Sequence, residues 1–289
     1  MLQRMPVAEH FFLAADEGRT DQRFCTFHPA QGGTVQGAIL YIHPFAEEMN
    51  KSRRMAALQA RAFSQAGYAV LQIDLLGCGD SSGDFADATW DAWIEDVLQG
   101  CRWLQERIHA SLWLWGLRAG CLLAVDAAAQ LRTSCDFLFW APTPAGKILL
   151  QQFMRLKAAN EMLSGGAKGI VEGLRQDLAA GNRVDIAGYA LSPDLATGLE
   201  RAQLTPPNAA HRPARPSRLE WFDLSTRDDA GLSPVAGKTV AQWRDAGFAV
   251  DSRVIVGPSF WQTTEIEDAP ALIQATTLAL RTEQSLVTA

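Results

Sequence analysis

Histidine is scarce in this sequence, and none occurs in its C-terminal part. The 289 residues include five histidines, of which His211 is the last. Histidine is the side chain that most often acts as a general base near neutral pH. The sequence therefore excludes any reaction that takes an imidazole base from the segments after residue 211.

The sequence also has no excess of basic residues. The chain has 26 Lys and Arg against 32 Asp and Glu, which gives a formal net charge of −6. Nucleic-acid binding relies on clustered Lys and Arg that displace counterions from phosphates. We therefore expect no nucleic-acid partner.

Long apolar segments are also absent. No stretch approaches the ~18–20 apolar residues that a membrane span needs. The first 18 residues carry acidic side chains where a signal peptide would be apolar. These features predict a cytoplasmic protein without a membrane span.

Cysteine is sparse and unpatterned. The five cysteines show no C-x-x-C pair, and their number is odd. This spacing favours free, mostly buried thiols over a disulfide framework, and it lacks the ligand pattern of a zinc site. We expect no metal and no cofactor.

Strand-like and helix-like segments alternate along most of the chain. Continuous apolar runs predict strands that are covered on both faces, and apolar residues at helical spacing predict amphipathic helices between them. The pattern predicts a mostly parallel, twisted sheet with helices on both faces, an α/β fold. The expected strands are residues 9–16, 22–29, 37–45, 68–77, 111–116, 136–142, 219–225 and 250–257, and the expected helices between them are 51–67, 90–107, 119–132, 234–247 and 269–283.

The alternation stops in the middle of the chain. Residues 143–217 contain two helical patterns followed by a segment rich in Pro and Ala. We interpret 143–217 as a helical cap or lid insertion, and 1–142 together with 218–289 as the α/β core.

Chemistry is expected where the parallel strands end, because ligands of open α/β sheets bind at the carboxyl ends of the strands. His43 and Phe45 follow one strand directly, with Glu47 and Glu48 close behind. The candidate residues after three other strands are Arg118, then Asp228 and Asp229, then Phe260 and Trp261.

This layout resembles the α/β-hydrolase fold over nearly the whole chain. Residues 116–120 (GLRAG) lie where that family has its G-x-S-x-G nucleophile elbow, and residues 74–83 resemble its D-x-x-G-x-G-x-S-x-G turn. The resemblance implies that Asp228 or Asp229 occupies the acid position of the triad. It also implies that Phe260 or Trp261 lies where the family carries its histidine.

Two of the three triad positions are therefore unsuited to hydrolysis. Arg118 stands in place of the serine, and a guanidinium stays protonated and offers no acceptor. The Ser-His-acid mechanism needs a base within hydrogen-bond reach of a hydroxyl. Only the acid remains, which argues against that mechanism.

A narrower resemblance is carried by five segments. They are HPFAEEMNKSRRM at 43–55, DLLGCGDSSGDF at 74–85, WGLRAG at 115–120, AGYALSP at 187–193 and GPSFWQTTEIEDAPALI at 257–273. Together they resemble the exosortase A system-associated hydrolase 2 family. That resemblance implies a place in bacterial gene sets for exopolysaccharide production and for sorting proteins with a PEP-CTERM tail. It also implies a protein partner in exopolysaccharide synthesis.

Arg118 has two interpretations. With the helix N-terminus behind it, the guanidinium would bind a carboxylate or phosphate of a ligand. Alternatively it forms an internal salt bridge to Glu47, Glu48, Asp228 or Asp229, which we favour because buried charges need partners.

His43 and the two glutamates also have alternatives. His43 either contacts a ligand or fixes its loop by a backbone hydrogen bond, and we favour the second. Glu47 and Glu48 are general acid or base candidates if they are buried, or ordinary partners of nearby Lys and Arg.

Two functions follow from these residues. The first is a pseudo-hydrolase that binds an anionic small molecule, an acyl or saccharide ligand, or a partner segment near Arg118. The second is an enzyme that acts on an ester, thioester or acyl-saccharide without the triad. In it, Arg118 would stabilise an oxyanion or anchor an anionic substrate, and protons would be handled by Glu47, Glu48, His43 or Asp228.

Overall fold

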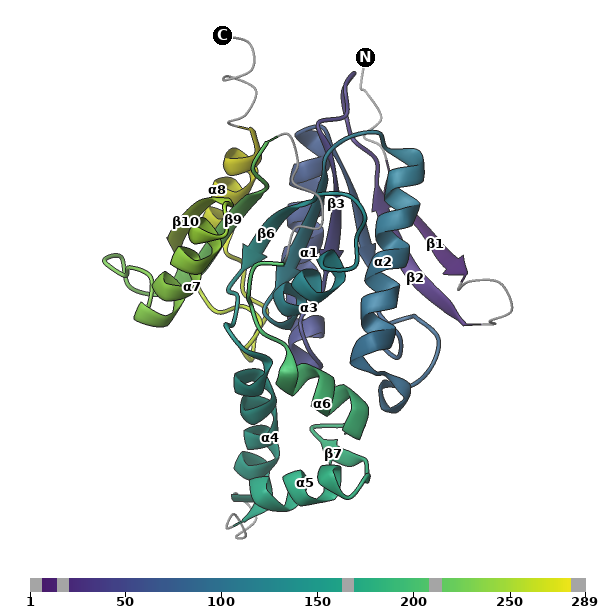
Figure 1. Cartoon of the computed structure of the whole chain (residues 1–289), viewed down its shortest axis with the longest axis vertical. Coiled ribbons are helices and arrows are strands. Elements are labelled where there is room, and N and C mark those ends of the chain that lie inside the picture. Colours follow the sequence, from purple (N-terminus) through teal and green to yellow (C-terminus); the bar gives the residue numbers. More distant parts are fainter. Residues whose placement is uncertain (1–6, 15–20, 163–168, 208–214, 282–289) are drawn as a thin grey trace.

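The computed structural model describes residues 7–14, 21–162, 169–207 and 215–281, and these form an eight-stranded sheet with helices on both faces (Figure 1). The strand order is β1-β2-β4-β3-β5-β6-β9-β10. The first two strands, β1 (Glu9–Ala14) and β2 (Gln22–His28), run antiparallel, and the pairs from β4 to β10 are parallel. The remaining strands are β3 (Gly37–Ile42), β4 (Tyr68–Ile73), β5 (Leu112–Leu117), β6 (Asp136–Trp140), β9 (Arg218–Ser225) and β10 (Ala249–Val256).

Helices cover the sheet in two layers, each with its own apolar core. On one face, α1 (Glu47–Gln65) and α8 (Pro270–Arg281) bury Phe63, Leu272 and neighbouring aromatic residues of the central strands. The other face is covered by α2 (Trp90–Arg107), α3 (Ala119–Ala128) and α7 (Pro234–Asp245). Because the central strands are buried on both faces, their sequences are continuous runs of apolar residues.

Three helices and a small hairpin between β6 and β9 lie together beyond the carboxyl ends of the strands (Figure 1). They are α4 (Gly146–Met162), α5 (Ile170–Ala179), β7 (Val184–Ile186), β8 (Tyr189–Leu191) and α6 (Pro193–Arg201). We call this group the cap elements. The hairpin and α6 are additions to the two helices that the sequence pattern predicts.

Several predicted strands extend beyond the observed ones, chiefly at their carboxyl ends. The apolar run 37–45 yields β3 over Gly37–Ile42 only, since His43 and Pro44 leave the sheet. The segment after β4 is likewise a turn, where the Ser81 hydroxyl accepts a hydrogen bond from the Phe24 amide (2.9 Å). The ends of the strands therefore differ from the predicted ends by a few residues, while the order of strands and helices along the chain agrees with the prediction.

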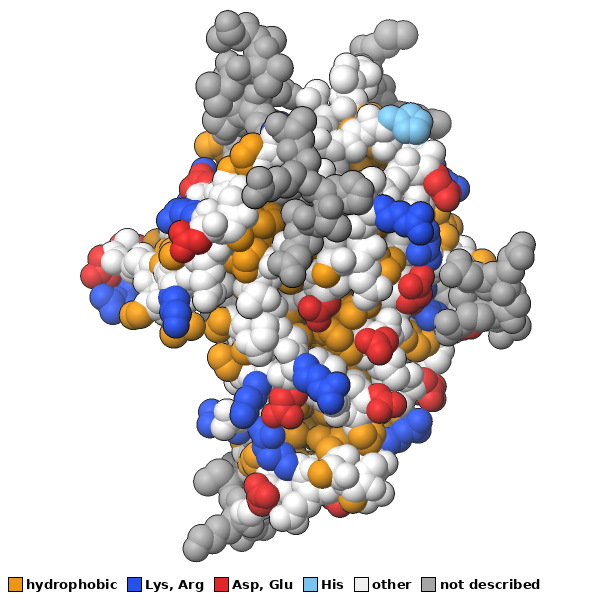
Figure 2. All heavy atoms as spheres, in the orientation of Figure 1, with side chains coloured by type: hydrophobic (Ala, Val, Ile, Leu, Met, Phe, Trp, Pro, Cys, Tyr) orange, Lys and Arg blue, Asp and Glu red, His pale blue; other side chains and the backbone are white. Residues whose placement is uncertain are grey.

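Basic and acidic side chains are interspersed on the face shown in Figure 2. No helix in the described part of the chain is long and apolar enough to cross a membrane. All five cysteines are buried free thiols, each with a pKa raised chiefly by burial.

Candidate functional site

Arg118 lies at the tight turn between β5 and α3. Its backbone adopts φ 56° and ψ −114°, a strained conformation for a residue other than glycine. Gly116 and Gly120 flank the turn, and a Cβ on either would collide with backbone atoms of Cys121 or Ile42. The two glycines let α3 pack closely against β3 and β5, and the turn places Arg118 at the carboxyl ends of the strands.

The Arg118 guanidinium is engaged on every nitrogen. Nε donates to Glu48 Oε1 at 3.3 Å, Nη1 donates to Thr143 Oγ1 at 3.0 Å, and Nη2 donates to Gln152 Oε1 at 2.8 Å. Nη2 also lies 3.3 Å from Glu48 Oε1. Only 9% of Arg118 is exposed. The internal salt bridge that the sequence favours is therefore the one that the structure shows, with Glu48 as the partner.

Trp261 lies over the same guanidinium. The Arg118 Cζ is 5.5 Å from the centre of the Trp261 ring, within range of a cation–π interaction. The indole nitrogen of Trp261 is buried without a hydrogen-bond partner in the described structure. Phe260 packs edge-on against Trp140 and Trp261. Of the two aromatic candidates, Trp261 is thus the one that contacts Arg118.

Glu48 is a buried acid with an unusual pKa. Burial raises the pKa of its carboxyl to about 7, although Arg118 opposes the shift by favouring the charged form. Its Oε2 atom is buried and accepts no hydrogen bond in the described structure. A carboxyl group with this pKa exchanges protons near neutral pH, which is the property of a general acid or base.

Glu47 presents a second unpartnered carboxyl oxygen. Its Oε2 is also buried without a hydrogen bond, and burial raises the pKa of its carboxyl. Glu47 and Glu48 open α1 directly after Ala46, whose backbone has a φ of 50°. The tight entry into α1 directs both carboxyl groups to the ends of the strands.

A cavity of about 210 Å³ lies between α1 and the cap helix α4. Its apolar walls come from Phe45 and from Leu149, Phe153 and Leu156 on α4, one face of that helix. Its polar lining consists of Glu47, Glu48, Lys51, Gln152 and Gln262. Within the described residues, neither a serine hydroxyl nor an imidazole lines this cavity.

His43 is bound to its own loop. Its Nδ1 donates to the Pro44 carbonyl at 2.8 Å, and its Nε2 accepts from the Leu75 amide at 3.3 Å, which assigns the neutral tautomer. Burial is the main cause of its lowered pKa. Both ring nitrogens are used, so His43 holds the loop and has no lone pair for a reacting group. His211 lies outside the described residues.

The acid position differs from the expectation. Asp228 and Asp229 are exposed in the loop after β9. Asp229 forms an ion pair with Arg227 at 3.0 Å and not with Arg118. The structure does not bring either one to the cavity, because β9 ends at Ser225 and the chain then turns into solvent. Burial raises the pKa of Asp223, within β9, while a hydrogen bond from Trp221 and the Arg118 charge act in the opposite direction.

Gln152, Thr143 and Gln262 were missed as site residues. Gln152 has a recognisable signal, since it lies among Leu149, Phe153 and Leu156 on the apolar face of α4. A polar side chain on such a face needs a partner inside the protein. Thr143 and Gln262 have no comparable signal, because each lies in a loop.

The described residues contain no candidate metal site. Within the described residues, no three His, Cys, Asp or Glu side chains are placed to hold one metal ion.

Comparison with sequence families gives one match. Residues 25–130 match the family model of the X-Pro dipeptidyl-peptidases (S15 family), which spans less than half of the chain. No curated protein sequence matches the chain.

Solved structures match over nearly the whole length. Est1E from Butyrivibrio proteoclasticus with bound ferulic acid superposes with a TM-score of 0.63 at 14% identity, covering 95% of this chain and 97% of that one. A thermostable carboxyl esterase from Bacillus coagulans gives 0.62 at 12% identity, with 97% and 98% covered. A monoglyceride lipase from Saccharomyces cerevisiae gives 0.62 at 15% identity with the same coverage. The chain therefore has the α/β-hydrolase fold, as its sequence predicts.

Proposed function

We propose that this chain is a pseudo-hydrolase that binds a small ligand in the cavity beside Arg118 and does not cleave it by a Ser-His-acid triad. The observation that carries the proposal is the state of Arg118. The guanidinium fills the position of a hydroxyl nucleophile and is held by Glu48 from the core and by Thr143 and Gln152 from the cap side.

The Arg118 side chain, held by its three protein partners, cannot react with an acyl group. A triad needs a hydroxyl and a base that takes its proton. Here the elbow side chain is a cation without an acceptor, and the ring that lies over it is the indole of Trp261, which cannot act as a base. Replacing both groups leaves a shaped cavity without the machinery for nucleophilic attack.

The cavity lining favours an acyl or saccharide ligand. Phe45, Leu149 and Phe153 offer apolar contacts to an acyl chain, and the polar side chains of the lining, Glu47 and Glu48 among them, offer hydrogen-bond partners to hydroxyl groups. An anionic ligand, the other expectation, suits the cavity less well. Two carboxyl groups line it against one lysine, and the Arg118 nitrogens already have protein partners.

The biological setting is proposed from the sequence resemblance. Ligands with acyl and hydroxyl groups fit a cytoplasmic role in exopolysaccharide production within the exosortase A system. Deletion of the gene in its host should reduce exopolysaccharide, and the wild-type gene should restore it. Restoration by Arg118→Ala to the wild-type level would show that the Arg118 site is not needed there.

A fluorophosphonate label tests the absence of a serine nucleophile. The intact mass of the protein should stay unchanged after incubation with this serine-directed reagent, because no activated hydroxyl lies at the elbow. A stoichiometric mass increase that disappears on denaturation of the protein before labelling would contradict the proposal.

The properties of Glu48 favour a second candidate function, which is hydrolysis without the triad. Its pKa of about 7 and its place in the cavity lining suit a general base that takes a proton from water. The water oxygen would attack the carbonyl of an ester, thioester or acyl-saccharide, and the proton would pass to the departing alkoxide or thiolate. Arg118 would stabilise the oxyanion that forms.

Turnover of p-nitrophenyl and thioester substrates separates the two functions. The pseudo-hydrolase predicts no release above the rate of the Glu48→Gln variant. Release by the wild type that falls by roughly a hundredfold or more in Glu48→Gln would establish the second function instead.

A further inference from the structure

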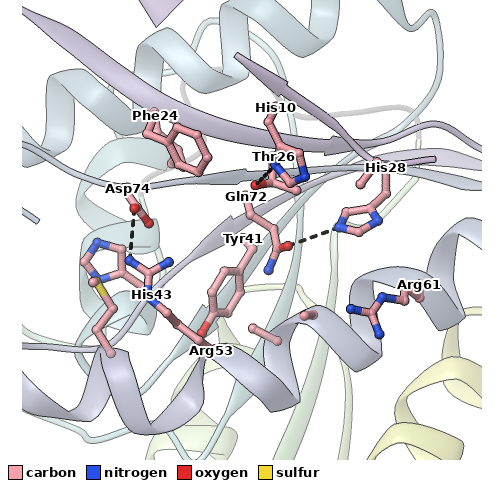
Figure 3. Close-up of a pocket in the computed structure, with 15 residues that line it drawn as sticks. His10, Phe24, Thr26, His28, Tyr41, His43, Arg53, Arg61, Gln72 and Asp74 are labelled. Carbon is pink, nitrogen blue, oxygen red and sulfur yellow. Dashed lines mark hydrogen bonds and ion pairs between the residues drawn. The ribbon is translucent and has the colours of Figure 1, made fainter. Parts of the chain in front are cut away.

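A second cavity, of about 270 Å³, lies on the other side of α1 from the first one. It opens between α1 and the strands β1, β2 and β4, at the antiparallel edge of the sheet (Figure 3). Met49, Arg53, Ala56, Ala57 and Arg61 of α1 line it, whereas Glu47, Glu48 and Lys51 of the same helix line the first cavity. The two cavities are therefore separate.

Five side chains that carry or acquire positive charge line this second cavity. Arg53 and Arg61 come from α1, His10 from β1, His28 from β2 and His43 from the loop after β3, as Figure 3 shows. Asp74 is the one carboxylate among the lining residues. It is already bound by Arg53 at 3.0 Å and by the Asp80 amide at 3.1 Å. In a chain of net charge −6, this cavity thus has a local excess of positive charge.

Several hydrogen-bond donors at the cavity have no protein acceptor in the described structure. Arg61 forms no ion pair there, and the Tyr41 hydroxyl makes no hydrogen bond. The Gln72 carbonyl oxygen binds the His28 ring at 3.2 Å, which leaves the Gln72 amide NH₂ group without an acceptor. Guanidinium, hydroxyl and amide donors around one space are the arrangement that oxyanions prefer.

The positive groups also oppose one another. Burial lowers the pKa of His28, and the Arg61 and His10 charges lower it further, while the Gln72 hydrogen bond acts in the opposite direction. Arg53 and Asp74 are the other charged groups that line the cavity near these side chains. A bound anion would relieve this repulsion, because it favours the charged form of each neighbour.

We propose that this cavity is a binding site for a small molecule with an oxyanion group, a phosphate or a carboxylate. Arg61, the Tyr41 hydroxyl and the Gln72 amide hold the oxyanion, and the stacked rings of His10 and Phe24, 6.0 Å apart, form the wall for the rest of the molecule. The proposal does not rest on the function proposed for the first cavity, since the two sites share no lining residue.

Calorimetric titration with two probes tests the proposal and identifies the anion. Inorganic phosphate represents a phosphate ligand, and benzoate represents a carboxylate with a planar body. Saturable binding of either probe at millimolar concentration is expected, and the tighter probe identifies the class. Binding of neither probe would overturn the proposal.

Variants locate the binding in this cavity. Arg61→Ala should weaken binding of the tighter probe by roughly tenfold, since a charge-assisted hydrogen bond is lost. Tyr41→Phe should weaken it by roughly threefold, because it removes the hydroxyl and keeps the buried ring. Arg132→Ala, an exposed arginine outside both cavities, is the matched control and should bind as the wild type does. Equal weakening by Arg61→Ala and Arg132→Ala would overturn the site, as would full affinity in both Arg61→Ala and Tyr41→Phe.

Discussion

Arg118 decides how the candidate site behaves. A serine at this position would need only a base, whereas an arginine needs a carboxylate and further acceptors when it is buried. The sequence reveals the arginine and the requirement for a partner. It names Glu47 and Glu48 among the candidates, but it does not reveal Thr143 or Gln152, which lie 25 and 34 residues further along the chain.

Arg118→Ala should be strongly destabilising. It leaves Glu48 buried without its cation and Gln152 without its donor, so we expect a loss of about 3–5 kcal/mol in the free energy of unfolding at neutral pH. Urea denaturation measures the loss. Arg54→Ala is the control, because Arg54 pairs with Asp268 on the surface and its loss should have a much smaller effect. Similar losses for the two variants would contradict the assigned role of Arg118.

Glu48 should make stability depend on pH. Its pKa is raised from 4.5 to about 7 in the folded protein, so the folded state binds the proton more tightly than the unfolded state does. The stabilisation is complete below pH 4.5 and is lost as the pH rises to about 7. Glu48→Gln lacks this titration. The wild type minus variant difference in unfolding free energy should therefore fall by roughly 3 kcal/mol between pH 4.5 and pH 8.

Denaturation of both proteins across that range measures this difference. A difference that stays constant would show that the Glu48 carboxyl titrates normally in the folded protein.

Elements of the core are well predicted from the sequence, and elements of the cap are predicted only in part. The buried strands and long amphipathic helices have strong periodic signals, so β3 to β6 and α1 to α3 follow from the pattern. The short helix α6 was missed although Ser192 caps it and Pro193 starts it, a recognisable N-terminal signal. The three-residue strands β7 and β8 are too short to show a period.

Close packing of α6 on α2 predicts a sharp difference between two glycines of the cap elements. A Cβ on Gly198 would collide with the Trp90 side chain, so Gly198→Ala should cost about 1–3 kcal/mol. Gly173 lies within α5 with nothing near its Cβ position, so Gly173→Ala should stabilise by up to about 1 kcal/mol. Thermal denaturation of the two variants measures both effects. If Gly198→Ala were as stable as Gly173→Ala, α6 would not pack on Trp90 as described.

The whole molecule shows why the fold was easier to predict than the site. The alternation of strands and helices and the two helix layers follow from apolar patterns that recur along most of the chain. The acid position is predicted at Asp228 or Asp229 from their place after a strand, yet both residues are exposed, whereas the Arg118 charge acts on Glu48 and on Asp223 within β9. β9 ends at Ser225 as the sequence predicts, but the pattern does not show that the residues after it turn into solvent, because their course depends on packing across the sheet.

The second cavity is another feature that the sequence alone does not predict. Its lining residues come from β1, β2, β3, β4 and α1, and only the folded sheet edge brings them together. His43, Arg53 and Asp74 lie in segments that carry the family resemblance, but nothing in those segments predicts a second cavity.

The most direct measurement follows 6-O-butanoylglucose by NMR in the presence of stoichiometric protein. This molecule has the acyl chain, the hydroxyl groups and the ester bond at issue. The account predicts saturation transfer from the protein to the acyl and sugar protons, reduced by Phe153→Ala, with no butanoate released. Release of butanoate by the wild-type protein, at a rate above that of the protein-free solution, would contradict it.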